Sequence, residues 1–338
     1  MPFTDQIIRY GSLSVVGLGK NTGKTECLRY VMDRLYQRQK VIAVTSIGID
    51  GEGVDRVTAT PKPEIFLEKG MFFTTVASYY SKKRFRAEIC EVLPNETVLG
   101  KMITARALER GKMILAGPAD TLLLQNWVHR MPQEYPIDVC LVDGAISRLS
   151  PASPAVTESM ILAVGAAYSL NMRTLAEKTR FVFDTVHLPL AGISLRKKLE
   201  NITRGIRGIS AGGEITDPGV ESALLPAGVR DVMDKCENRI YVPGAVSNAL
   251  LKTLAERKEV ERTELYIRDF SRIFAEPRVF YSFLRKGGRM FQLFKTRLLA
   301  VCVNPVSPEG YRLNSEELVD VIQKEVGIPV YDIKKMKG

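Results

Sequence analysis

The sequence predicts an α/β fold, with a mostly parallel sheet flanked by helices and a second, tightly joined α/β half. Two observations favour this class. Short apolar, β-branched runs alternate with helix-period patterns along the chain, and no Pro/Gly/Ser-rich linker interrupts them. The 338 residues are 45% hydrophobic and 25% charged, which is ordinary for folded domains. We place a first domain at residues 1–180 and a C-terminal α/β half at residues 181–338, which is either separate from the first domain or continuous with it.

The first elements are organised around residues 12–29, which read SLSVVGLGKNTGKTECLR. An apolar run is followed by a glycine-rich turn and then by a helical pattern, which is the context in which Gly-Lys-Thr forms a phosphate-binding loop, or P-loop. Glycines let successive backbone N–H groups point at phosphate oxygens, and the helix adds the positive end of its dipole. We therefore predict a P-loop NTPase-like domain that binds a nucleotide, expected to be ATP, with Mg²⁺. The turn itself does not define the base of the nucleotide. Leu18 stands where the usual spacing has its first glycine, so the loop is a variant.

The predicted nucleotide-binding residues are those of this turn. Lys24 is expected to reach the β- and γ-phosphates and to act in catalysis, while the Thr25 hydroxyl takes a position on Mg²⁺. The alternative is an ordinary strand-to-helix turn that contains Gly-Lys-Thr by chance. The predicted contacts to the nucleotide are Gly17, Gly19, Lys20, Asn21, Thr22, Gly23, Lys24 and Thr25.

Two later strands supply the other predicted site residues. Residues 39–46 form a β-branched strand that is followed by Asp50, and residues 137–144 form an apolar strand that ends in Asp143. Because ligands of open α/β sheets bind at the carboxyl ends of strands, we predict Asp143 and Asp50 as catalytic residues and Mg²⁺ ligands. Arg148 follows and is predicted to stabilise charge on a transferred phosphoryl group. The alternatives are a solvated loop for Asp50 and a structural salt bridge for Arg148.

The remaining elements follow from the same patterns. Residues 159–169 are rich in small side chains and predict a helix that packs on the sheet. Residues 297–304 predict a buried strand, and the loop after it lies on the P-loop edge if this strand is parallel. Asp120, just after an expected strand at 112–118, is a weaker site candidate. The other expected strands are 71–77, 87–93, 181–188, 239–244, 264–269 and 329–333, the other expected helices are 104–110, 221–236, 245–258, 275–286 and 315–325, and a hairpin is expected at 206–219.

Composition narrows the class of protein. No apolar window of 18 or more residues is present and the N-terminus lacks a basic-then-apolar segment, so we expect neither a membrane span nor a secretory signal. The five cysteines are widely separated and form no C-x-x-C pair, which predicts reduced thiols and a cytoplasmic protein. The net charge is +10, with basic clusters at 81–86 and 285–289. No nucleic-acid-binding motif accompanies these clusters, so we interpret them as solvated or partner-facing surface.

The loop has counterparts in known P-loop proteins. Its spacing, a glycine followed by five residues and then Gly-Lys-Thr, resembles that of dethiobiotin synthetase. Its segment Lys-Asn-Thr-Gly-Lys-Thr resembles the loop of molybdopterin-guanine dinucleotide synthesis adaptors. In this broad group a second copy or a partner protein commonly completes the site, so the resemblance implies either a homodimer or a partner complex. The first resemblance also supports an alternative function as an ATP-dependent ligase or kinase, in which Lys62, between two prolines, contacts the substrate or a phosphate. The alternative for Lys62 is a rigid loop without a function in binding.

A longer resemblance covers residues 12 to about 180. The segments VVGLGKNTGKTE, VTSIGIDGE, ILAGPAD and LVDGAISRLSPASPAVTESMILAVGAA resemble the small P-loop subunit of the lysine 5,6-aminomutase reactivase. This resemblance implies a chaperone-like ATPase that restores an adenosylcobalamin- and pyridoxal-phosphate-dependent enzyme after damage to its cobalamin. Its implied partners are a larger MutS-like ATPase subunit and lysine 5,6-aminomutase. The alternatives are the ligase or kinase described above and, from charge alone, a nucleic-acid-binding module.

Overall fold

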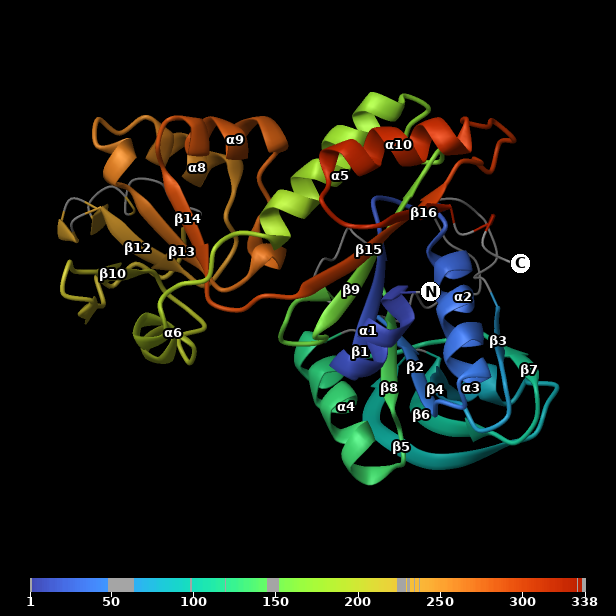
Figure 1. Ribbon diagram of the computed structural model, residues 1–338. Helices are drawn as coiled ribbons and strands as arrows, with labels where there is room; N and C mark the ends of the chain where they lie inside the picture. The colour runs from blue at the N-terminus through green and yellow to red at the C-terminus, as the bar shows by residue number, and fades with distance from the viewer. Residues whose placement is uncertain are drawn as a thin grey trace. The chain divides into compact units, whose positions relative to one another are not determined.

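In the computed structural model the chain forms two compact units (Figure 1). Unit 1 comprises Met1–Thr179 and Thr296–Gly338, and unit 2 comprises Arg180–Lys295. The predicted halves, 1–180 and 181–338, differ from these units in the last segment, whose strand pairs with the sheet of unit 1. The residues that the structure describes are 2–47, 64–97, 99–118, 120–144, 152–223, 229, 232–233, 235–236, 238–332 and 334–335.

Unit 1 contains a nine-stranded sheet among the described residues, in the order β16-β15-β9-β1-β8-β2-β4-β6-β5. The strands from β16 to β4 are parallel to their neighbours, while β6 is antiparallel to both β4 and β5. A mixed α/β unit with a large, mostly parallel sheet flanked by helices is therefore present, as predicted. Its elements are α1 (Pro2–Tyr10), β1 (Ser12–Gly17), α2 (Lys24–Gln37), β2 (Ile42–Ser46), β3 (Ile65–Leu67), β4 (Phe72–Val76), α3 (Ala77–Tyr80), β5 (Ala87–Thr97), β6 (Gly100–Ala107), β7 (Gly111–Met113), α4 (Thr121–Glu134), β8 (Val139–Asp143), β9 (Ser159–Gly165), β15 (Arg297–Asn304), α10 (Ser315–Glu325) and β16 (Val330–Asp332). Helix α5 (Met172–Val186) begins in unit 1 and ends in unit 2.

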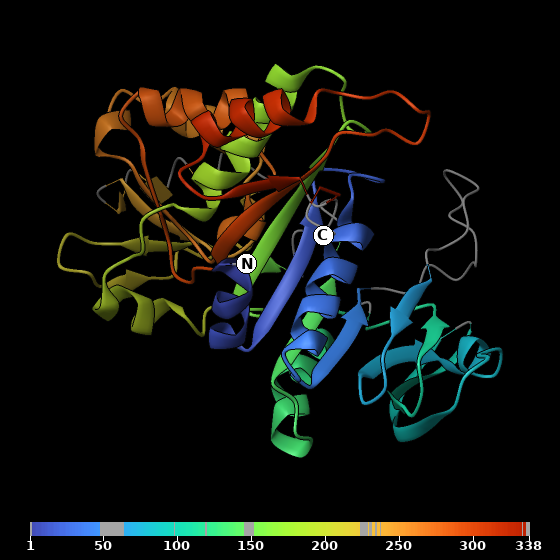
Figure 2. The same ribbon diagram turned by 45° about the vertical axis from the view of Figure 1, so that its right-hand side comes forward.

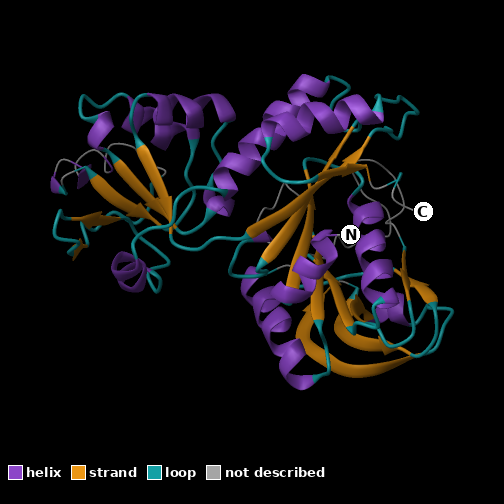
Figure 3. Cartoon of the chain, viewed as in Figure 1, coloured by secondary structure: helices purple, strands orange, loops and turns teal. Residues whose placement is uncertain are grey.

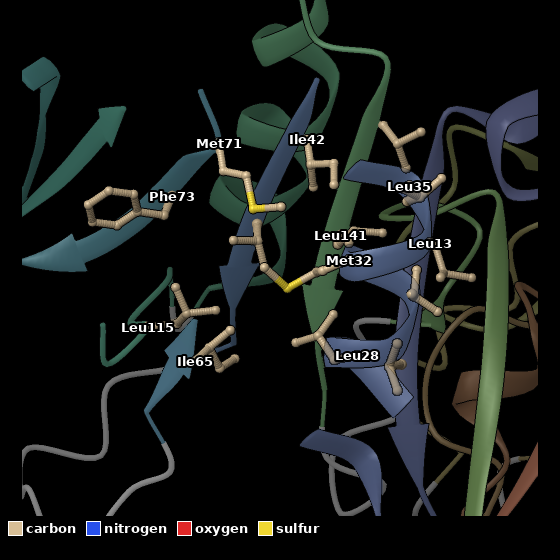
Figure 4. Packing of buried hydrophobic residues seen from close by; sticks show 14 of the residues in the cluster. Leu13, Leu28, Met32, Leu35, Ile42, Ile65, Met71, Phe73, Leu115 and Leu141 are labelled. Atoms are coloured by element: carbon tan, nitrogen blue, oxygen red, sulfur yellow. The ribbon is translucent and has the colours of Figure 1, made fainter. Parts of the chain in front are cut away.

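The sheet of unit 1 has a core on each face. Alternate residues of a strand point to opposite faces, so Leu13 of β1 and Leu141 of β8 pack with Leu28 and Met32 of α2 on one side (Figure 4). On the other side, Cys140 and Val142 of β8 pack against α4, whose Trp127 is 1% exposed. Both faces of the central parallel strands are covered, which explains why these strands read as unbroken apolar runs.

The antiparallel end of the sheet lies beyond β2 and is drawn in cyan and teal in Figure 2. Trp127 of α4 reaches this end, where its indole Nε1 donates to Thr104 Oγ1 at 3.0 Å. The expected strand at 112–118 is shorter than predicted, since only β7 pairs, with β3. The residues after β7 lie along β4, because the Thr75 hydroxyl donates to Ile114 O and Ala116 N donates to Thr74 O. They then approach the end of β2 at Gly117, where an added β-carbon would lie 1.7 Å from Ser46 O.

Three predicted elements are wrong in type. The predicted helix at 159–169 is strand β9, whose seven residues are all buried between β1 and β15. The predicted helix at 104–110 falls on β6, which pairs on both sides. The predicted strand at 181–188 is the last part of helix α5, in which Val182 and Val186 are buried one turn apart. A short apolar run carries no periodicity that separates a buried strand from a buried helix, and pairing partners decide.

Unit 2 is a smaller α/β unit. Its sheet has the order β11-β10-β12-β13-β14, with β12, β13 and β14 parallel. Helices α8 and α9 cover one face and α6 covers the other, as Figure 3 shows. The predicted hairpin at 206–219 is confirmed as β10 and β11. The elements are α6 (Ile193–Leu199), β10 (Arg207–Ile209), β11 (Ile215–Thr216), β12 (Arg239–Val242), α8 (Asn248–Ala255), η3 (Val260–Arg262), β13 (Glu264–Ile267), η4 (Phe270–Arg272), α9 (Pro277–Arg285) and β14 (Arg289–Gln292).

The cysteines are free, as predicted, and Cys27, Cys140 and Cys302 are buried. The Cys27 thiol donates to Cys302 Sγ at 3.4 Å, where α2 packs on β15. This hydrogen bond and burial raise the pKa of Cys27 well above its ordinary value, and burial raises the pKa of Cys140 to about 12. Cys27 and Cys140 are therefore protonated and act as small apolar side chains in the core.

Candidate functional site

The carboxyl ends of four adjacent parallel strands meet at one edge of the sheet in unit 1. Strand β1 ends at Gly17, β8 at Asp143, β9 at Gly165 and β15 at Asn304. Their registers agree, since Val15 lies opposite Asp143 and Gly165 lies opposite Asn304. The predicted P-loop and the predicted acidic strand end are therefore neighbours.

The turn after β1 folds back over the strand that precedes it. Leu18 N donates to Ala163 O at 2.9 Å, which extends the pairing of β1 with β9 by one residue. The chain then reverses with positive φ at Asn21 (57°) and Gly23 (97°), while the Thr22 hydroxyl donates to Gly19 O at 3.1 Å. A backbone held in this way turns N–H groups toward one point, as anion-binding turns do.

The loop passes so close to the end of β1 that only glycine fits at position 17. A β-carbon placed on Gly17 would lie 2.3 Å from Thr22 Oγ1 and 2.7 Å from Lys24 Cγ, so the stem of Lys24 crosses directly over the end of β1. This explains the variant spacing in the sequence. The close approach falls on the last residue of the strand, whereas Leu18 is 6% exposed and packs as a core residue.

Helix α2 begins at the end of this turn. Its N-cap is Gly23, so no side chain caps the first N–H groups of the helix. These groups have no partner within a helix, and the dipole places partial positive charge on them. The end of the loop therefore presents donors of the kind that bind phosphate.

Lys24 and Asp143 interact electrostatically. Burial lowers the pKa of Lys24 below its ordinary value, the Asp143 carboxylate opposes this shift, and Lys20 adds to it. Asp143 is half-buried at the tip of β8, between β1 and β2. The Lys24 ammonium is buried beside a single carboxylate. A further negative charge nearby, such as a phosphate, would stabilise this ammonium.

The donor set fits a phosphate-bound Mg²⁺. Thr25 is the second residue of α2 and Asp143 ends the adjacent strand, and Mg²⁺ is commonly bound by few protein oxygens together with substrate phosphates. A cluster of three or more His, Cys, Asp or Glu side chains, which would hold a metal without phosphate, is not found in the described part of the chain. Asp50 and Arg148 lie outside the described residues, as does Lys62.

Two residues that the sequence did not single out line the loop. A β-carbon on Gly19 would lie 3.0 Å from the Tyr168 ring, and one on Gly23 would lie 2.8 Å from Asn304 Cβ. Asn304 follows from the prediction that the end of this strand reaches the P-loop edge, because β15 is parallel to β9. Tyr168 was missed because its segment was assigned to a helix, although an apolar run followed by Gly-Ala-Ala-Tyr could have been read as a strand end.

Asp120 has a structural role in this structure. It is the N-cap of α4, and its Oδ1 accepts from Leu122 N at 2.8 Å and Leu123 N at 3.1 Å. The carboxylate therefore satisfies two of the N–H groups that a helix start leaves without partners. This accounts for Asp120 without a catalytic function.

The lowered pKa of Lys24 leads to a pH-dependent prediction. Phosphate favours the protonated amine, so nucleotide affinity should be constant below the pKa of Lys24 in the free protein and fall as the pH rises through it. Because burial lowers that pKa, the fall should begin below 10.5, the value of an ordinary lysine. Titration of the protein with a non-hydrolysable ATP analogue at a series of alkaline pH values measures this. A Lys24→Met variant should show weaker binding without this pH dependence, and an equal fall in the variant would contradict the assignment.

Two further findings concern membrane-spanning helices and likeness to known proteins. Among the described residues, no helix has the length and apolarity that crossing a membrane requires. No family model, no curated protein and no solved structure matches the chain when it is compared with them.

Proposed function

We propose that unit 1 binds ATP with Mg²⁺ in the turn formed by residues 17–25 and hydrolyses it. One observation carries the proposal. The Lys24 stem crosses Gly17 at the end of β1, beside a helix start without a side-chain cap and next to the Asp143 strand end. Strand, glycine turn and helix in this order, with an acidic neighbouring strand, are the parts of a P-loop NTPase site.

Each residue then has a definite task. Backbone N–H groups of the loop hold the phosphates, and the Lys24 ammonium neutralises charge that develops on the γ-phosphate oxygens. Thr25 and Asp143 would hold Mg²⁺, which would supply positive charge to the phosphates. Partial burial makes these interactions stronger than in water, because the surroundings screen charge poorly. Asp50 and Arg148 are proposed, from sequence alone, as a further Mg²⁺ ligand and a charge-stabilising group.

The ATPase is further proposed to be the small subunit of a reactivating factor. Support comes from the sequence resemblance over residues 12 to about 180, which includes the unusual loop after Asp143 as well as the P-loop. In this proposal the protein works with a larger MutS-like ATPase subunit. ATP turnover drives a conformational change that restores an adenosylcobalamin- and pyridoxal-phosphate-dependent lysine 5,6-aminomutase.

The test reconstitutes the reaction in three steps. Phosphate release from ATP is measured with the protein alone, with the larger subunit, and with both plus aminomutase carrying damaged cobalamin. We expect Mg²⁺-dependent hydrolysis that increases with the partners, and recovery of aminomutase activity only when ATP is present. Hydrolysis that the partners leave unchanged, without recovery, would contradict the reactivase role alone. Absence of both ATP binding and hydrolysis under all three conditions would contradict the ATPase as well.

A further inference from the structure

Unit 2 contains a cavity that the proposed ATPase does not use. Its volume is about 530 Å³, within the range of roughly 300–1,000 Å³ that is typical of small-molecule sites. Three segments line it, at residues 203–207, 217–223 and 242–245. The last of these follows β12, so the cavity lies at the carboxyl end of a parallel strand, where ligands of open α/β sheets bind.

The walls of the cavity are held in place by their own hydrogen bonds. Ile206 N donates to Val220 O at 2.8 Å, which joins the first two segments. Arg207 Nη2 bonds Asp217 Oδ2 at 2.9 Å, and Asp217 Oδ1 accepts from Gly219 N at 2.9 Å. Arg207 and Asp217 are thus engaged with each other and with the backbone, and they support the wall.

The lining combines an apolar floor with four charged side chains, of which Arg207 and Asp217 pair with each other. Ile206 and Val242 are each 1% exposed and Ala223 is 5% exposed, and together they form the floor. Arg204 and Glu221 are exposed at the cavity, on the two segments that the Ile206–Val220 hydrogen bond joins. Neither side chain forms a hydrogen bond or an ion pair with the described residues. Besides the Arg207–Asp217 pair, the cavity therefore offers one cation, one carboxylate and an apolar surface between backbone segments.

We propose that this cavity binds a free α-amino acid with an apolar side chain. The guanidinium of Arg204 takes the ligand carboxylate in the two-pronged geometry that arginine offers, and Glu221 takes the ammonium group. The apolar side chain covers the floor of Ile206, Ala223 and Val242, which removes its surface from water. A purely anionic ligand would face Glu221, and a purely cationic one would face Arg204. Charges of both signs therefore select a zwitterion.

Isothermal titration calorimetry of the full chain with L-leucine tests the proposal without any nucleotide, so its outcome is independent of the ATPase assay. We expect one saturable site. Arg204→Gln and Glu221→Gln should each weaken L-leucine binding at least tenfold, whereas Lys258→Gln, an exposed change elsewhere in unit 2, should leave it unchanged. The matched probes 4-methylpentanoate, without the ammonium, and 3-methylbutylamine, without the carboxylate, should each bind at least tenfold more weakly than L-leucine.

A space-filling variant separates binding from folding. Gly244 lines the cavity and a β-carbon there meets no atom within 4 Å, so Gly244→Leu should fold normally and weaken binding by narrowing the cavity. Gly327→Leu is the matched control, because Gly327 has the same open surroundings in unit 1. Three results would overturn the proposal: no binding of L-leucine, unchanged affinity in the Arg204 and Glu221 variants, or binding of 4-methylpentanoate as tight as that of L-leucine.

Discussion

Replacing Lys24 by methionine is expected to lower ATP turnover by about 10²-fold or more, the effect of removing one preorganised charge-stabilising group from an active site. Methionine keeps most of the unbranched stem that crosses Gly17, so the packing of the loop is retained. Burial lowers the pKa of Lys24, which means that the charged amine is disfavoured in the nucleotide-free protein. The variant should therefore unfold at the same temperature as the parent or slightly higher, while it loses activity.

Two measurements check this expectation together. Steady-state phosphate release gives the loss of turnover, and thermal unfolding without nucleotide gives the stability. Lys69→Met is a suitable control, because Lys69 is exposed at a turn away from the loop and its replacement should change neither quantity. Full activity in Lys24→Met would remove the P-loop mechanism, and equal losses of stability and activity would show that Lys24 acts in folding.

Replacing Gly117 by alanine is expected to destabilise the protein by about 3 kcal/mol, at the upper end of the cost of overpacking a core. A β-carbon on Gly117 would lie 1.7 Å from Ser46 O and 2.5 Å from Thr45 Oγ1. The first contact is with backbone, which no change of rotamer relieves, so the end of β2 must move. Ser46 lies opposite Asp143, and Ile47 N donates to Asp143 O, so this movement should also reach the candidate site.

Urea unfolding of Gly117→Ala and of the parent gives the difference in free energy of unfolding. Gly327→Ala should stay within about 0.5 kcal/mol of the parent, because its added carbon meets no atom. We also expect weaker ATP binding in Gly117→Ala at temperatures where it is fully folded. Parental stability in this variant would show that β2 does not lie against the segment that follows β7.

Local pattern predicted the strand and the helix on either side of the glycine-rich turn, the strand that ends at Asp143 and the late strand at 297–304. In these segments the residue order itself carries the signal: an apolar run stops at a glycine or acid, and a helical period begins or a loop follows. The same reasoning failed for β9, because Ala163 and Gly165 suggested helix packing while their true neighbours are strands on both sides. It failed for α5 because Val182 and Val186 are β-formers that a helix places on one buried face.

Some site residues depend on partners that are distant in the chain. Asn304 contacts the loop because β15, which follows the loop by more than 270 residues, joins the sheet beside β9. Tyr168 lies against Gly19 because β9 is a strand and not a helix. Asp120 carried the same sequence signal as Asp143, an acid after an apolar segment, yet it caps a helix. Only the placement of the neighbouring elements distinguishes these two carboxylates.

The sequence by itself determined the α/β class of this protein and the order of strand, glycine-rich turn and helix that begins at residue 12, because apolar periodicity and glycine act through local backbone geometry. Tertiary structure alone decided that the last segment returns to unit 1, which strand ends border the loop, and that unit 2 encloses a cavity of its own. The physical reason is that strand order and cavity walls arise from pairing between segments far apart in the chain. That pairing leaves no periodic trace in either segment.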